Sequence, residues 1–134
     1  MSIFDLFKKR KVELTEEEQR WNKIWDLWVE EKAESPYQEL MTYHSEINCN
    51  GHFLYFLNLH GLDELEHNIK VLEKVLPSNH LKNFKTAYEA YNKLDIESEE
   101  ELAQITLEKC DEFFFENETD INLILCDYAC KVEL

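Results

Sequence analysis

Glycine and proline are nearly absent from this chain, whose 134 residues include only two of each. Hairpins and β-sandwiches depend on these residues for tight turns, so the scarcity argues against an all-β fold and leaves helix as the default. A hydrophobic share of 44% supplies enough apolar surface for a core, and the length is that of one domain. We therefore predict an all-α fold: a single compact domain over residues 15–134, with about six to seven helices, after an N-terminal segment over residues 1–14.

Two capping boxes mark helix starts. Thr15 with Glu18 precedes apolar residues at helical spacing, which predicts an amphipathic helix over about residues 16–33. Ser98 with Glu101 repeats the pattern at the start of a later helix. The apolar face of this later helix is expected to consist of Leu102, Ile105, Cys110, Phe113 and Phe114.

The middle of the chain is divided by a polar stretch at residues 48–51, where we predict a turn. Before it, Ser35 and Pro36 are typical of a helix start, so a second helix should run to about residue 48. After it, the apolar residues 53–59 predict a third, short segment that is almost wholly buried.

Two more helices follow, each with apolar residues alternately three and four positions apart. The first runs from Leu62 to Leu76 and is ended by Pro77. The second begins at a cap formed by Ser78 or Asn79 and runs to about residue 94. Such spacing predicts one buried face for each helix.

The last predicted helix follows residues 117–120 and has apolar residues on two opposite faces. Burial of both faces leaves two alternatives open: the helix is central to the fold, or its second face meets another copy of the chain as a homodimer. One face consists of Ile121, Ile124, Leu125, Tyr128 and Val132, and the other of Leu123, Cys126 and Cys130.

The chain is strongly acidic, with 29 Asp and Glu against 14 Lys and Arg and a formal net charge of -15. Phosphate binding needs a basic surface, so this balance argues against a direct nucleic-acid ligand and favours a basic protein as partner. The acidity is concentrated between residues 95 and 120, where the only basic residue is Lys109. The candidate partner-binding residues there are Asp95, Glu97, Glu99, Glu100, Glu101, Glu108, Asp111, Glu112, Glu116, Glu118 and Asp120.

The spacing of these acids suggests what the surface could imitate. Helix-surface carboxylates at i and i+4 lie about 6 Å apart, on the scale of the phosphate spacing along a nucleic-acid strand. Such a surface can resemble DNA to a DNA-binding protein. The alternative is that the acids only favour helix N-termini and solubility. Further acids that could help are Glu16, Glu17, Glu30, Glu31 and Glu34.

The N-terminal segment is amphipathic, since Ile3, Phe4, Leu6 and Phe7 precede a basic run at residues 8–11. This pattern can lie on an anionic membrane, but because the segment is short we expect it to dock on the body of the protein, without stable membrane association. The sequence has no bilayer-spanning apolar run and no signal-peptide pattern, so we expect a cytoplasmic protein.

Candidate metal-binding and catalytic groups are few. His60, Glu64 and His67 would share a helix face, but that face lies opposite the apolar seam and should be solvated, so we assign no metal. The chain has no Gly-rich phosphate loop and no hydrolase motif, and we predict neither a cofactor nor enzyme activity. Four cysteines lack zinc-site spacing and are expected to be reduced and buried: Cys49, Cys110, Cys126 and Cys130.

The segment EINCNGHFLYFLN, residues 46–58, resembles the signature of a bacterial family of small acidic all-helical proteins that includes a DNA mimic. The resemblance extends over residues 37–131 and departs from the family pattern at Cys49, Asn50 and Leu54. The residues that fit the pattern are Glu46, Ile47, Asn48, Gly51, His52, Tyr55, Phe56 and Asn58.

The resemblance implies a compact all-α domain in which an Asn-Gly turn packs an aromatic segment into the core. It also implies a role like that of the family's DNA mimic, a dimer whose acidic surface occupies the DNA-binding face of a transcriptional repressor. Because the motif residues are largely apolar or turn-forming, we interpret them as structural rather than as a binding site.

Three hypotheses follow for the function. The first is a non-enzymatic acidic protein that occupies the basic DNA-binding surface of a transcription regulator. The second is an immunity-type inhibitor of a basic toxin such as a nuclease. The third is a small-ligand-binding or enzymatic domain with a pocket near His44, His52 and Tyr55.

Overall fold

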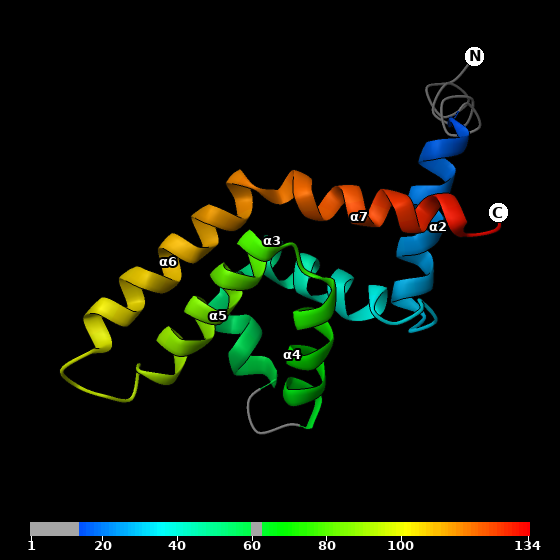
Figure 1. Cartoon of the computed structure of the whole chain (residues 1–134). Helices are drawn as coiled ribbons and strands as arrows, with labels where there is room; N and C mark the ends of the chain where they lie inside the picture. Colours follow the sequence, from blue (N-terminus) through cyan, green and yellow to red (C-terminus); the bar gives the residue numbers. More distant parts are fainter. Residues whose placement is uncertain (1–13, 60–62) are drawn as a thin grey trace, which may run out of the picture.

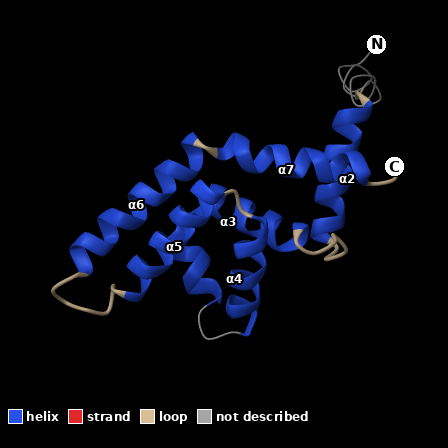
Figure 2. Cartoon of the chain, in the orientation of Figure 1, coloured by secondary structure: helices blue, strands red, loops and turns tan. Residues whose placement is uncertain are grey.

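The computed structural model describes residues 14–59 and 63–134, and in this part of the chain every regular element is a helix (Figure 2). The predicted all-α fold is confirmed. The six helices are α2 (Glu16–Val29), α3 (Tyr37–Leu59), α4 (Asp63–Val75), α5 (Ser78–Asn92), α6 (Glu100–Glu116) and α7 (Glu118–Lys131). The predicted N-terminal segment covers residues 1–14, and all of it except Leu14 lies outside the described residues. His60 also lies outside them.

Helix α3 is the centre of the fold, because it contacts each of the other five described helices. Its buried side chains join an aromatic cluster in which Tyr43 meets Tyr55, Phe84 and Phe114 edge to face, at centroid distances of 5.3, 5.3 and 5.5 Å. All four rings are almost completely buried. Edge-to-face contacts add to the stabilisation that comes from the buried area.

Helices α6 and α7 together form a bent arch across the molecule (Figure 1). Helix α5 lies alongside α6, and α2 crosses α7 near the C-terminus. The small side chains Ala87 and Ala90 of α5 and Ala103 of α6 are all buried, which allows these two helices to pack closely.

A kink replaces the turn predicted at residues 48–51. Asn48, Cys49 and Asn50 continue the helix, and only Gly51 leaves it, with φ 81° and ψ 176°. A side chain is strained at such positive φ, so glycine is the residue that suits this position. The second and third predicted segments are therefore two halves of α3, joined at Gly51.

The prediction of an almost wholly buried segment after the turn is wrong. Tyr55 and Phe56 are buried, but Phe53 and Leu57 are exposed to 43% and 46%. The second half of α3 is an ordinary amphipathic helix with one face on the core.

Only one of the two predicted capping boxes forms. The Thr15 side chain accepts a hydrogen bond from the backbone N–H of Glu18 at 3.1 Å, as predicted, although α2 ends at Val29 rather than near residue 33. At α6 the N-cap is Glu99, and no side chain caps the helix. The Ser98 box is therefore wrong, and so is the predicted side-chain cap of α5, whose N-cap is Pro77.

The apolar face predicted for α6 is wrong in part. Leu102 is 68% exposed and Ile105 is 42% exposed, whereas Ala103 and Leu107 are buried with Cys110 and Phe114. The close approach of α5 explains the difference, because it favours the face that carries the small Ala103.

Helix α7 is not central to the fold. Its first face is buried through Ile121, Leu125 and Tyr128, but Leu123 is 60% exposed and Cys126 and Cys130 are exposed. The second face borders a largely apolar groove of about 630 Å³ against α2.

All four cysteines are free, and the prediction that they are buried holds only for Cys110.

Candidate functional site

The eleven predicted partner-binding acids divide into two groups. Three of them pair with histidines of other helices, and all three pairs hold α6 or α7 against the body: Asp111 with His52, Glu118 with His44 and Asp120 with His80. The other eight form no ion pair and no side-chain hydrogen bond within residues 14–59 and 63–134: Asp95, Glu97, Glu99, Glu100, Glu101, Glu108, Glu112 and Glu116.

Asp111 joins α6 to the kink of α3. Its Oδ1 accepts the backbone N–H of His52 at 2.8 Å and lies 2.6 Å from Nδ1 of the same residue. On the far side of the ring, Nε2 of His52 lies 2.6 Å from the hydroxyl of Tyr43. We assign the proton to Nδ1, so that His52 donates to Asp111 and accepts from Tyr43. Burial raises the pKa of Tyr43 well above its usual value, which keeps the hydroxyl a donor.

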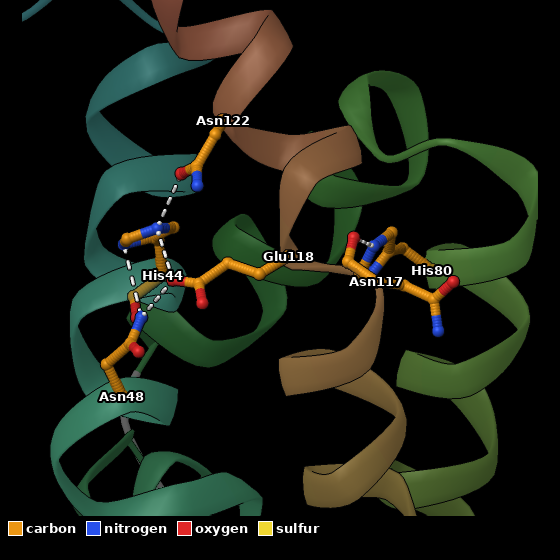
Figure 3. Close-up of polar contacts among 6 residues, drawn as sticks. All are labelled: His44, Asn48, His80, Asn117, Glu118 and Asn122. Atoms are coloured by element: carbon orange, nitrogen blue, oxygen red, sulfur yellow. Dashed lines mark hydrogen bonds and ion pairs between the residues drawn. The ribbon is translucent and has the colours of Figure 1, made fainter.

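The corner between α6 and α7 holds a second polar cluster (Figure 3). Nε2 of His44 lies 3.0 Å from both Oδ1 of Asn122 and Oε1 of Glu118, and Nδ2 of Asn48 donates to the same Glu118 oxygen at 3.0 Å. These contacts connect the first half of α3 to the start of α7. Burial lowers the pKa of His44, and the Glu118 carboxylate opposes that shift.

A third histidine fixes the corner from the side of α5. His80 is completely buried, and its Nε2 lies 2.7 Å from the carbonyl oxygen of Asn117, the residue between α6 and α7 (Figure 3). Asp120 accepts a hydrogen bond from Asn79 at 3.1 Å. The three histidine contacts together hold the acidic stretch in one position relative to the core.

Four of the unpaired acids form a stripe along α6. At about 100° per residue, Glu101, Glu108, Glu112 and Glu116 fall within an arc of about 80° on the side away from the buried Cys110. All four are exposed. We call these four residues the α6 stripe. The helical rise places Glu108, Glu112 and Glu116 about 6 Å apart along the axis.

The residues of the family-like motif are structural in this fold. Tyr55 and Phe56 lie in the aromatic cluster, His52 is buried beside Asp111, and Gly51 forms the kink. Asn50 donates to Glu46 on the surface, and Asn48 belongs to the corner cluster. Asn58 is exposed near the end of α3.

The proposed pocket near His44, His52 and Tyr55 is not supported by their positions. His52 and Tyr55 are buried in the core, and His44 is covered by Glu118 and Asn122. A hollow of about 240 Å³ does lie nearby, beside Gly51, Asn48 and Asp111.

Burial raises the pKa of the Cys110 thiol to about 11, so that this thiol stays protonated at neutral pH.

No cluster of three or more metal-ligating side chains occurs in the part of the chain that the structure describes. Nε2 of His67 lies 3.2 Å from Oε1 of Glu39. Over the same residues, no helix is both long and apolar enough to span a membrane.

The role of Asp111 is the site feature that sequence reasoning missed. A signal was present, since Asp111 directly follows the buried Cys110 and lies one turn after the buried Leu107. Its position borders the buried face, unlike the neighbouring Glu112.

The fold and the exposed stripe define a class of protein: a small, strongly acidic, all-helical domain. A family model, described as DMP19-like protein, matches residues 40–132, and the chain belongs to this family. Comparison with curated proteins gives no match, and comparison with solved structures gives none either.

Proposed function

We propose that the protein is a non-enzymatic DNA mimic whose α6 stripe occupies the basic DNA-binding surface of a transcription regulator. The observation that carries the proposal is the row of exposed glutamates on one helix face, without a cationic partner among the described residues. Membership of the DMP19-like family supports it.

The electrostatics of the stripe favour a cationic partner. Unpaired carboxylates of one sign repel one another, and this repulsion is relieved when a basic surface covers them. Complementary charge also accelerates and orients the encounter between proteins. The spacing of about 6 Å between successive carboxylates of Glu108, Glu112 and Glu116 is on the scale of the phosphate spacing along one DNA strand.

The rigid support of α6 fits the same role. A mimic has to present its charges at fixed separations, because flexible charges would lose entropy when they bind. The Asp111–His52 pair and the corner cluster fix α6 at its middle and at its C-terminal end.

A partner that binds DNA also implies a location in the bacterial cytoplasm. The acidic surface itself should not bind nucleic acid.

The test is a capture experiment at low salt. The full-length protein is immobilised, bacterial lysate is applied, and bound proteins are eluted first with salt and then with duplex DNA. We expect a basic DNA-binding protein that DNA displaces and that is lost steeply between about 50 and 300 mM salt, because exposed charges are screened. Recovery of a basic nuclease would assign the inhibitor role instead.

A pair of variants shows whether the α6 stripe is responsible for capturing the DNA-binding protein. The stripe variant carries Glu101→Gln, Glu108→Gln, Glu112→Gln and Glu116→Gln. The matched control makes the same change at four exposed glutamates, three on α4 and one after α7: Glu64, Glu66, Glu73 and Glu133. We expect capture to fail with the stripe variant and to persist with the control. Equal loss with both variants would show that only net charge matters.

A further inference from the structure

A groove of about 500 Å³ lies between the second half of α3, the start and middle of α6, and the chain that follows α5. Its apolar wall includes Phe53, Leu94 and Leu107. Four carboxylates also line it: Asp95, Glu100, Glu108 and Asp111. We call this feature the α3–α6 groove. Its volume is in the range of about 300 to 1,000 Å³ that is usual for ligand sites.

The apolar wall of the groove is open to solvent at Phe53, whereas Leu107 is buried. Phe53 is 43% exposed, although its ring centroid lies 6.1 Å from that of Tyr91 on α5. Leu94 is half-buried. An exposed aromatic ring beside a hollow is apolar area that a ligand can still remove from water.

Three of the groove carboxylates lack a counter-ion among the described residues. Asp95, Glu100 and Glu108 form no ion pair with a basic side chain anywhere in residues 14–59 and 63–134. Asp111 also borders the groove, but it is already bound to His52. The groove therefore combines uncompensated negative charge with exposed apolar surface.

This combination fits one kind of side chain. Lysine and arginine have an apolar stem that can cover a hydrophobic wall and a cationic head that stays at the rim. Arginine can in addition stack on an aromatic ring and bind a carboxylate through two parallel hydrogen bonds. A small hydrated cation would gain nothing from the apolar wall, and nucleic acid would be repelled by the rim.

We propose that the α3–α6 groove receives an arginine or lysine side chain from a basic segment of the partner, with its stem on Phe53 and its head between Asp95, Glu100 and Glu108. This inference rests on the proposed function. It adds an apolar contact with the partner that DNA, which the protein imitates, does not make. The apolar part of the contact survives salt, whereas the carboxylate part is screened. Recognition is then by shape and charge together, not by charge alone.

The test uses two synthetic peptides with the full-length protein. The first is a lysine-rich peptide. The second has 2,4-diaminobutyrate in place of each lysine, which keeps the ammonium head on a shorter stem. Binding is measured by fluorescence anisotropy at about 50 mM and at about 300 mM salt, because the higher salt screens the carboxylates. We expect the lysine peptide to bind at least tenfold more tightly than the short-stem peptide at the higher salt, since only the lysine stem covers Phe53.

Two triple variants locate the contact. The groove variant is Asp95→Asn, Glu100→Gln and Glu108→Gln. The control is Glu64→Gln, Glu66→Gln and Glu73→Gln on α4, which removes the same charge at exposed residues outside both the groove and the α6 stripe. We expect the groove variant to weaken peptide binding at least tenfold and the control less than threefold. Amide chemical-shift changes on peptide addition should concentrate around residues 94–95, 100 and 107–108.

The outcomes separate this inference from the proposed function. A loss of less than threefold in the groove variant, with shifts centred on Glu112 and Glu116, would overturn the groove and leave the charge-based mimic standing. Equal loss from both variants would show that only net charge matters, and would remove the role of both the groove and the α6 stripe. If neither peptide binds, both lose their role as well. Circular dichroism of each variant confirms that helical content is unchanged.

Discussion

The carboxylate of Asp111 and the imidazole of His52 lie 2.6 Å apart, although 59 residues separate them in the chain. The same carboxylate oxygen accepts the backbone N–H of His52, just after the Gly51 kink. One side chain therefore caps the second half of α3 and fixes the middle of α6. The acid that looks like part of a docking surface in the sequence is part of the scaffold.

The first prediction compares two neighbouring acids that differ in their contacts. Asp111→Asn removes the charge that binds the His52 ring and backbone, and should lower the free energy of unfolding by about 1 to 3 kcal/mol. Glu112→Gln makes the same charge change at an exposed residue and should change it by less than about 0.5 kcal/mol. Urea unfolding measures both. Equal losses would show that the Asp111–His52 contact has no special role.

The second prediction concerns the kink. An alanine Cβ at position 51 would lie 2.5 Å from Oδ2 of Asp111 and would adopt a φ of +81°. Gly51→Ala should therefore destabilise the protein by at least about 1 to 3 kcal/mol, since both strain and the displaced carboxylate contribute. Cys49→Ala, at an exposed position in the same helix half, is the control and should be nearly neutral. A stable Gly51→Ala protein would contradict the tight approach of α6 to the kink.

The third prediction is a pH dependence that comes from His44. Burial lowers the pKa of His44 below its usual 6.5, so the unfolded chain binds this proton more readily than the folded chain. Stability from this source is complete above pH 6.5 and is lost as the pH falls from 6.5 to the lowered pKa.

The measurement is urea unfolding at several pH values for the wild type and for His44→Gln. Below pH 6.5 the wild type should lose stability more steeply than the variant, by at most about 1.4 kcal/mol per pH unit. Parallel curves for the two proteins would show that His44 does not contribute.

The fourth prediction compares the two capping boxes. Thr15→Ala removes an observed cap and should cost about 0.5 to 2 kcal/mol. Ser98→Ala should cost little, because no side chain caps α6. Thermal unfolding by circular dichroism distinguishes the two. A larger loss from Ser98→Ala would mean that α6 begins differently.

Much of the fold is predictable from local sequence patterns. The scarcity of glycine and proline, the Thr15 box and the leucine seam of α4 each act within a few residues, so they predict helices without knowledge of the partners. Leu65 and Leu72 are buried as the seam predicts. The orientation of α6 is not predictable in this way, because the face around Ala103 is selected by the approach of α5.

Of the candidate site, only the concentration of acidic residues could be predicted from the sequence. The sequence shows eleven acids between residues 95 and 120, but all are alike until the fold brings histidines to three of them. His52, His44 and His80 come from α3 and α5, far along the chain from their partners. Such long-range pairs leave no periodic signal in a single sequence, and they decide which carboxylates remain free.

The most direct test of the central claim is the affinity of the captured DNA-binding protein for the wild type and for the stripe variant, measured across a salt series. We predict that the wild type binds at least tenfold more tightly at about 100 mM salt, with a steeper loss of affinity as salt rises. Duplex DNA should compete with the wild type for the same surface. Equal affinities and equal salt slopes for the two proteins would contradict the account.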